Sequence, residues 1–147
     1  MRIAHFVMML SLAPLLALAA TPAQEKQFVD TYRKAYEGKD EKTLTGLLYT
    51  KGADPQAAEF YKMMMTSGMG GKIGTIQLAD LTADDKKRAA GGPGPDGKPM
   101  KFTLPPVKKL VIKIETKDAN GSSTSSNEVF VGETDGKLVI PVPGPAA

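Results

Sequence analysis

The residues that come nearest to a catalytic set are one carboxylate and two tyrosines. Asp80 ends an apolar stretch in which it alternates with Ile76 and Leu78, so the three side chains point to one face of a strand. If that face is interior, desolvation raises the pKa of the carboxyl toward the range of a general base. Tyr32 and Tyr36 stand one helical turn apart and would supply hydroxyl donors. One hypothesis is therefore a pocket enzyme that transfers protons.

The same residues have a structural interpretation. Asp80 can simply end its strand, and the tyrosines can be core aromatics whose hydroxyls reach water. Phe28, Tyr32 and Tyr36 recur at intervals of four, which is the spacing of one stripe on an amphipathic helix. We favour a non-catalytic binding domain over the enzyme. The side chains that we expect to line its pocket are Tyr32, Tyr36, Tyr61, Met65 and Asp80.

Composition excludes several kinds of site. The chain has no cysteine, and His5 is its one histidine. We expect residues 1–20 to be cleaved, and the remaining chain then offers neither cysteine nor histidine for a zinc site or an imidazole-dependent triad. Thioethers can hold cuprous copper, and four methionines lie close together at Met63, Met64, Met65 and Met69. Adjacent methionines point to different sides of a helix, which favours core packing or an adaptable surface. We expect no metal and no cofactor.

The charge of the chain is mildly basic, with 19 Lys and Arg against 16 Asp and Glu. Loss of Arg2 with a leader would leave 18 − 16 = +2. The basic runs Lys86–Arg88 and Lys108–Lys109 carry no interleaved aromatics of the kind that stack on bases. We therefore expect no nucleic-acid partner, and a small molecule or a protein is the expected ligand.

The first twenty residues have the features of a secretory signal peptide. Arg2 precedes an apolar run from Ile3 to Leu18, and Ala17-Leu18-Ala19 is a small-x-small cleavage signal. The run is too short, and too broken by Ser11 and Pro14, for a membrane span, which needs about 20 apolar residues. The sequence predicts export to the periplasm or the extracellular space, with no membrane insertion after cleavage.

Residues 21–142 are long enough for one domain, and residues 143–147 are expected to form a flexible tail. Three helices come first, each preceded by a capping residue followed by helix-forming residues. Their caps and spans are Thr21 before 24–37, Asp40 at the start of 40–50, and Asp54 before the segment ending near Gly68. A further single helical turn is expected after Thr82.

The second half of the domain has the alternation of strands. Strands are expected at 72–81, 100–104, 108–116, 127–133 and 137–142. Asp135-Gly136 between two apolar runs predicts a tight hairpin turn rather than an ion site. Segments 89–99 and 121–127, rich in Gly and Pro or in Ser, are expected to be connections. Helices followed by antiparallel strands indicate an α+β domain.

The segment FVDTYRKAYEGKDEKTLTGLLYTKG and the closing GKLVIPV resemble the nuclear transport factor 2-like superfamily. The resemblance implies three N-terminal helices packed on a bent, cone-shaped antiparallel sheet of four to five strands, with a pocket between them. It also implies a homodimer formed through the sheet. Members similar to ketosteroid isomerases pair a carboxylate base with a tyrosine donor, the roles that Asp80 and Tyr32 or Tyr36 would take. The chain departs from the pattern in segment 89–99 and in lacking tryptophan.

Overall fold

The structure, a computed structural model, describes residues 19–146, and nearly all of the expected signal peptide lies outside them. The fold is α+β. Its helices are α1 (Pro22–Glu37), α2 (Glu41–Thr45), α3 (Pro55–Thr66) and α4 (Ala83–Ala89). The turn expected after Thr82 is therefore a fourth helix. Within residues 19–146, every helix is too short or too polar to cross a membrane.

The helix starts follow the capping pattern of the sequence. Thr21 Oγ1 accepts a hydrogen bond from the Gln24 backbone, and the Gln24 side chain accepts one from the Thr21 backbone, so both halves of a capping box are present. Asp40 and Asp54 each accept a backbone hydrogen bond three residues ahead, and Pro55 occupies the first turn of α3. The three predicted N-terminal caps are confirmed.

The main sheet has five strands in the order β1-β7-β6-β5-β2. They are β1 (Leu48–Tyr49), β2 (Ile73–Asp80), β5 (Pro106–Asp118), β6 (Gly121–Thr134) and β7 (Lys137–Pro141). β1 runs parallel to β7, with Leu48 opposite Ile140, so the sheet is mixed and the expectation of a wholly antiparallel sheet is wrong. The backbone of segment 47–49, which was expected to be helical, instead bonds to the free edge of β7.

A second, smaller sheet is formed by β3 (Gly92–Pro93), β4 (Pro99–Phe102) and β8 (Pro143–Pro145). The flexible tail expected at 143–147 is therefore wrong for its first three residues, because Pro143 stands opposite Phe102. Gly144 is buried, and a Cβ on it would lie 2.1 Å from the Gly52 carbonyl oxygen. Close packing at this glycine ties the end of the chain to the body.

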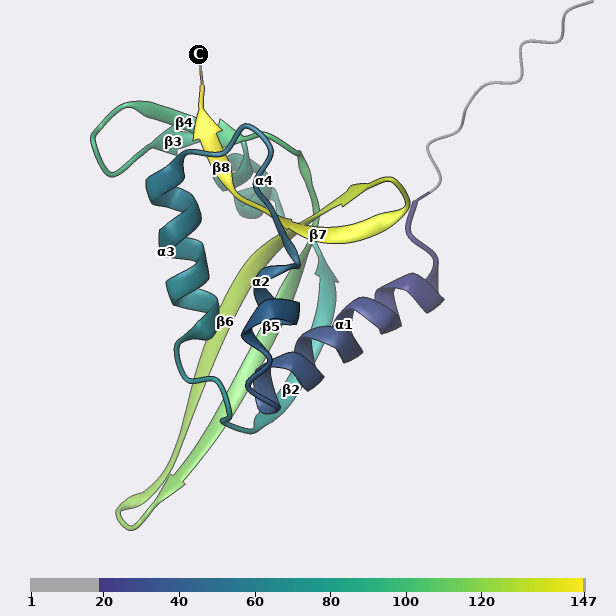
Figure 1. The fold of residues 1–147 in the computed structure, drawn as a ribbon, viewed down its shortest axis with the longest axis vertical. Coiled ribbons are helices and arrows are strands. Elements are labelled where there is room, and N and C mark those ends of the chain that lie inside the picture. Colours follow the sequence, from purple (N-terminus) through teal and green to yellow (C-terminus); the bar gives the residue numbers. More distant parts are fainter. Residues whose placement is uncertain (1–18, 147) are drawn as a thin grey trace, which may run out of the picture.

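The hairpin of β5 and β6 is the longest feature of the molecule. Its strands pair from Lys108–Val131 out to Asp118–Gly121, and only Ala119 and Asn120 lie between them. The serine-rich segment 121–127, expected to be a flexible link, is therefore strand, because it pairs along its whole length with the alternating residues of β5. Figure 1 shows this arm extending beyond the helices.

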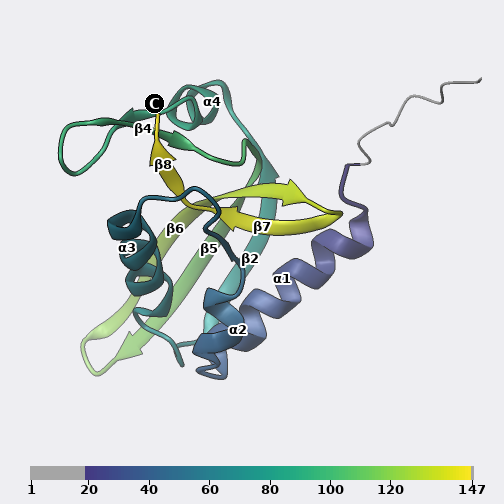
Figure 2. The same ribbon diagram turned by 45° about the horizontal axis from the view of Figure 1, so that its top comes forward.

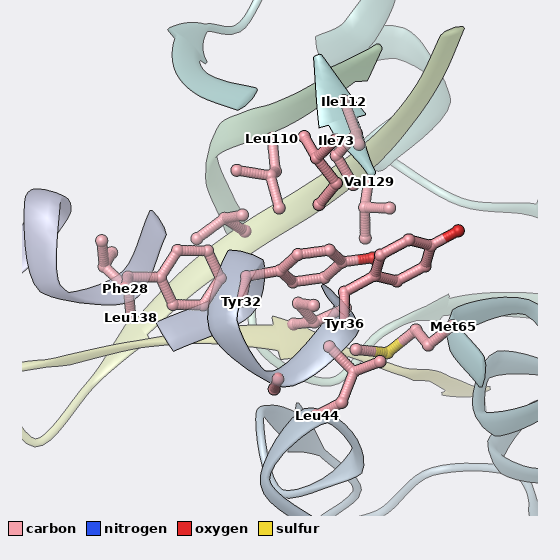
Figure 3. Packing of buried hydrophobic residues seen from close by; sticks show 13 residues of the cluster. Phe28, Tyr32, Tyr36, Leu44, Met65, Ile73, Leu110, Ile112, Val129 and Leu138 are labelled. Carbon is pink, nitrogen blue, oxygen red and sulfur yellow. The ribbon is translucent and has the colours of Figure 1, made fainter. Parts of the chain in front are cut away.

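The core lies between α1 and the helix-facing side of the sheet. Figures 1 and 2 show α1 crossing that side, with α2 and α3 beside it. The stripe Phe28, Tyr32 and Tyr36 is buried, as its spacing predicted. It packs with side chains of the sheet and of the other helices, among them Leu44, Met65, Ile73, Leu110, Ile112, Val129 and Leu138 (Figure 3).

Candidate functional site: a cavity between helices and sheet

A cavity of about 550 Å³ opens beside the core, and we call it the helix–sheet cavity. Tyr32 and Tyr36 of α1 line it, together with Met64 and Met65 of α3 and the turn that follows α3. The opposite wall comes from β5 and β6. Its residues there are Ile112, Ile114, Thr116, Ser125, Ser126, Asn127, Glu128 and Val129.

The two tyrosines form one continuous surface. Their rings are stacked, with centroids 6.3 Å apart and planes inclined by 12°. Figure 3 shows both hydroxyls directed away from Phe28, toward the same end of the row. The Tyr36 hydroxyl donates a long hydrogen bond of 3.5 Å to the Ser67 carbonyl. Gly68 follows with a φ of +79°, and a Cβ there would lie 2.8 Å from the Tyr36 hydroxyl, so glycine keeps that space open.

Burial sets the protonation state of these hydroxyls. Desolvation, followed by the neighbouring Tyr36, raises the pKa of Tyr32 to about 12. Desolvation also raises the pKa of Tyr36. At neutral pH both groups are therefore uncharged phenols, which donate a hydrogen bond well and remove a proton poorly.

The sheet wall changes from apolar to polar along its length. Leu110 stands opposite Val129, Ile112 opposite Asn127 and Ile114 opposite Ser125. Side chains on one face of two paired strands lie next to one another, so the apolar pairs lie by the core and the polar groups lie toward the arm. Ser125 and Asn127 are exposed. A ligand in the cavity would meet rings and branched side chains at one end and neutral hydrogen-bonding groups at the other.

The charged residues that line the cavity, Arg88 and Glu128, pair with each other at 3.6 Å. Both also join a network around Asp85, whose side chain is 1% exposed. Lys109 Nζ lies 3.0 Å from Asp85 and 3.2 Å from Glu128, and Arg88 hydrogen-bonds to Asp85. Each charge at the cavity thus has an opposite charge beside it.

Asp85 is the centre of this network. The backbone N–H of Thr82 donates to its carboxylate, and this bond, followed by the bond from Lys109, holds the pKa of Asp85 well below its usual range. Arg88 also lies over the Phe130 ring, 5.6 Å from its centroid. Asp85 is not among the residues predicted from the sequence. The available signal was the spacing Thr82-x-x-Asp85, which is that of a capping box.

The structure brings together only some of the expected pocket residues. Tyr32, Tyr36 and Met65 lie together in the helix–sheet cavity. Tyr61 lies in a different, apolar groove between α3 and the small sheet, beside Phe60. Asp80 lines neither of these two spaces. Its side chain is 95% exposed and its nearest charged partner is Lys108, at 3.7 Å.

The expected interior position of Asp80 is therefore wrong, although the alternation that suggested it is present. Ile76, Leu78 and Asp80 pair with Ile112, Leu110 and Lys108 of β5, all on one face. Ile76 and Leu78 on that face pack against the core. At the end of the strand, Asp80 lies beside Lys108, which also pairs with Glu25 near the start of α1, and within residues 19–146 no cavity is present there. The carboxylate and the tyrosine hydroxyls do not share a site.

The two alternative ligand sites weighed from sequence are also not assembled. Met65 is buried in the core, whereas Met63 and Met64 are exposed at 63% and 40%, so these thioethers do not converge. Lys108 pairs with Glu25 at 2.9 Å, and Lys109 is engaged by Asp85 and Glu128. The second basic run is thus paired with carboxylates rather than presented as a free positive patch.

Comparison of the chain with protein-family models, with curated protein sequences and with solved structures gives no match in any of the three. Function is therefore inferred from the helix–sheet cavity and the residues that line it.

Proposed function

We propose that the protein is a binding domain that holds a small, uncharged and largely apolar ligand in the helix–sheet cavity. The observation that carries this proposal is the pair of stacked, protonated tyrosines forming one wall of a cavity of about 550 Å³. Small-molecule sites typically have about 300–1,000 Å³, apolar walls and a few polar groups. The cavity has this size, and its lining is apolar at the end by the core and polar toward the arm.

The lining favours a neutral ligand. Arg88 and Glu128 neutralise each other, so an ionic ligand would have to displace an existing pair. A carbonyl or hydroxyl oxygen can instead accept from a tyrosine hydroxyl, while a ring or chain packs against Ile112 and Ile114. We do not extend the proposal to proton transfer, because Asp80 lies apart from the tyrosines.

Binding of a neutral, apolar dye such as Nile red tests the proposal by its fluorescence. The blocking variant is Ser125→Phe, which adds a ring to a residue that lines the cavity. The matched control is Ser122→Phe, on the opposite face of β6, where neither Ser122 nor its cross-strand neighbour Lys117 lines the cavity. We expect the first variant to weaken dye binding at least about tenfold, a change of about 1.4 kcal/mol, and the control to bind as wild type does.

Two results would overturn the proposal. One is an absence of dye binding by the wild-type protein, and the other is equal binding by wild type and Ser125→Phe. Circular dichroism melting of both variants shows whether each remains folded. If Ser125→Phe retained saturable binding, the dye site would lie outside the helix–sheet cavity. The apolar groove at Phe60 and Tyr61 would then be tested next.

We further propose that this domain is an exported member of the nuclear transport factor 2-like superfamily. The support for the family is the order of elements, helices followed by a largely antiparallel sheet with a cavity between them. The support for export is the signal-like composition of residues 1–20. Mass spectrometry of the protein recovered from the medium or the periplasm tests export, and a product that keeps Met1 or stays in the membrane would contradict it.

A further inference from the structure

A second space lies next to the helix–sheet cavity, along the same helix. It is the apolar groove between α3 and the small sheet, and its volume is about 440 Å³. Phe60 and Tyr61 form its α3 wall, and Met100 and Phe102 of β4 form another wall. Figures 1 and 2 show α3 starting beside the small sheet and ending beside β6, so one helix borders both spaces.

The spacing of residues along α3 shows that the two spaces are adjacent. Tyr61 lines the groove, and Met65, four residues later, lines the cavity. Phe60 and Met64 repeat this relationship. Residues four apart lie on one face of a helix, about 5.4 Å from each other along its axis. Two rows of α3 side chains therefore lead from the groove into the cavity.

The side chain of Arg88 stands where the two spaces meet, because it lines both. Its guanidinium hydrogen-bonds to Asp85, lies 3.6 Å from Glu128 and covers the Phe130 ring at 5.6 Å from the centroid. Phe130 in turn meets Phe102 of the groove edge to face, with centroids 5.5 Å apart. Since carboxylates already pair with the Arg88 charge, the junction does not require a charged group from a ligand.

The two spaces differ in polarity. The cavity presents neutral polar groups, those of Tyr36, Ser125 and Asn127, beside its apolar side chains. The groove is lined by apolar side chains, prolines and glycines, apart from the charges of Arg88 and Lys101 and the hydroxyl of a tyrosine. A ligand that occupied both spaces would therefore match them best with a polar head group in the cavity and an apolar tail in the groove.

We propose that the cavity and the groove form one elongated site for a neutral amphiphile with a hydroxyl or carbonyl head group and a single long alkyl chain. This inference rests on the proposed function and adds the shape of the ligand to it. The head group lies by the Tyr36 hydroxyl, and the chain passes Arg88 and ends between Phe60 and Phe102.

The path between the two ends is bent, which selects a flexible chain over a rigid ring system. Asn127 and Glu128 are neighbours on β6 and point to opposite faces of the strand, yet both line the cavity. The cavity therefore reaches across the edge of β6, and Arg88 lies on the Glu128 side of it. An alkyl chain turns at such an edge by rotating about single bonds between staggered states. A flat, fused ring system has no such rotation.

The span from head to tail sets a minimum chain length. The Tyr36 hydroxyl lies beside Gly68, where a Cβ would be 2.8 Å from it. Phe60 precedes Gly68 by eight residues, which corresponds to about 12 Å along a helix. Hexanol is too short to extend from the hydroxyl to Phe60, whereas dodecanol is long enough. These two alcohols therefore distinguish the cavity alone from the elongated site.

Displacement of Nile red by hexanol and by dodecanol tests the proposal. We expect wild type to bind dodecanol at least about a hundredfold more tightly than hexanol, because each added methylene buries apolar area. Phe60→Asp places a carboxylate in the groove and should reduce this ratio at least about tenfold. The matched control is Met63→Asp, the same change at an exposed residue of α3 that lines neither space, and it should keep the wild-type ratio. Melting curves confirm that both variants are folded.

Photo-crosslinking of the wild-type protein provides a second measurement that needs no variant. A dodecanol with a diazirine at the end of its chain should label the small sheet near Met100 and Phe102, as located by peptide mass spectrometry. Labelling confined to the helix–sheet cavity overturns the elongated site. So does an equal ratio of the two affinities in wild type and Phe60→Asp while Nile red still binds. Failure of Nile red to bind wild type overturns the proposed function, and this inference with it.

Discussion

Asp80 and Lys108 lie directly opposite each other at the end of the β2–β5 ladder, with their charged atoms 3.7 Å apart. Lys108 is shared, because Glu25 of α1 lies closer to it, at 2.9 Å. Both carboxylates act on the lysine, Glu25 more than Asp80, and together they raise the pKa of Lys108. The carboxylate that alternation places on the helix-facing side thus ends in a surface ion cluster and not in a cavity.

The first prediction follows from this position. Exposed ion pairs typically contribute about 0–1 kcal/mol, and the Asp80 side chain is 95% exposed. Asp80→Asn should therefore change the free energy of unfolding by less than about 1 kcal/mol and leave dye binding unchanged. Urea unfolding and Nile red titration check both. Glu25→Gln is the control, because it removes the closer partner of Lys108 and should have the larger effect. Lost dye binding in Asp80→Asn would contradict the placement.

The second prediction concerns alkaline pH. An unfolded tyrosine has a pKa of about 10, whereas burial and then Tyr36 raise the pKa of Tyr32 to about 12. The native state therefore holds this proton more tightly. Its stabilising effect is complete below about pH 10 and is lost as the pH rises toward 12, with a total loss of about 3 kcal/mol.

Absorbance of tyrosinate during an alkaline titration measures this directly. We expect the last of the four tyrosines to ionise near pH 12 and Tyr32→Phe to remove that step. Tyr49→Phe, which alters a tyrosine outside the helix–sheet cavity, should leave the step in place. If the last step persisted in Tyr32→Phe, the assignment would be wrong.

Local signals in the sequence predicted the elements well. The caps at Thr21 and Asp54 and the turn at Asp135-Gly136 are confirmed, because each depends on a few neighbouring residues and their backbone geometry. The aromatic stripe of α1 is also buried as expected. Segment 121–127 was misjudged because serine and glycine are typical of loops, whereas its strand conformation comes from pairing with β5 in a hairpin and not from its own composition.

The site was less predictable, because its residues come from segments far apart in the chain. Tyr32 and Tyr36 meet Ser125 and Asn127 only after the long arm has folded back along β5. The parallel pairing of β1 with β7 likewise joins residues about ninety positions apart, and no local pattern contains that information. A correct prediction that Asp80 is exposed would have required knowing where α1 begins on the sheet. The period-two alternation of β2 indicated the face on which the Asp80 side chain lies, but not whether that face is covered at the end of the strand.

The third prediction concerns acid pH and Asp85. The Thr82 backbone bond, followed by the Lys109 bond, holds the pKa of Asp85 well below its usual range, and an unfolded aspartate has a pKa of about 3.9. The stabilisation by Asp85 is therefore fully present above about pH 4 and is lost as the pH falls below it. Asp85→Asn should lower the melting temperature at neutral pH and flatten the decline of stability in acid.

The matched control for Asp85 is its neighbour in α4. Asp84 is exposed and, within residues 19–146, pairs with Lys87 at the surface, at 3.6 Å, so Asp84→Asn should melt close to wild type and keep the decline in acid. Melting curves between about pH 2 and pH 7 compare the three proteins. Equal melting temperatures for Asp85→Asn and wild type would show that the network contributes nothing to stability.

The fourth prediction concerns the hairpin of β6 and β7. Asp135 and Gly136 have φ values of +50° and +71°, as a two-residue hairpin turn requires. A Cβ on Gly136 would meet only Gln24 Nε2 at 3.7 Å, so space is adequate and strain alone decides the outcome. Gly136→Val should destabilise by about 1–3 kcal/mol and Gly136→Asn by less than about 1 kcal/mol, because asparagine tolerates positive φ. Urea unfolding distinguishes them, and equal losses would contradict the strain argument.

The fifth prediction joins the expected signal cleavage to the same hairpin. Glu133 Oε2 accepts a hydrogen bond of 3.0 Å from the backbone nitrogen of Ala20, so Glu133 does more than lead into the turn. If cleavage follows Ala19, that nitrogen becomes a charged amino group, and the bond becomes a charge-assisted ion pair. Glu133→Gln should then cost about 1 kcal/mol or less in the processed protein.

The comparison that isolates this pair uses a protein extended by one residue before Ala20, in which the same nitrogen is an uncharged amide. Glu133→Gln should cost less in the extended protein than in the processed one, and the difference between the two costs measures the contribution of the new amino group. Urea unfolding of the four proteins gives this cycle, and mass spectrometry fixes the first residue of the processed form. Equal costs in both backgrounds would show that the amino group at Ala20 does not pair with Glu133.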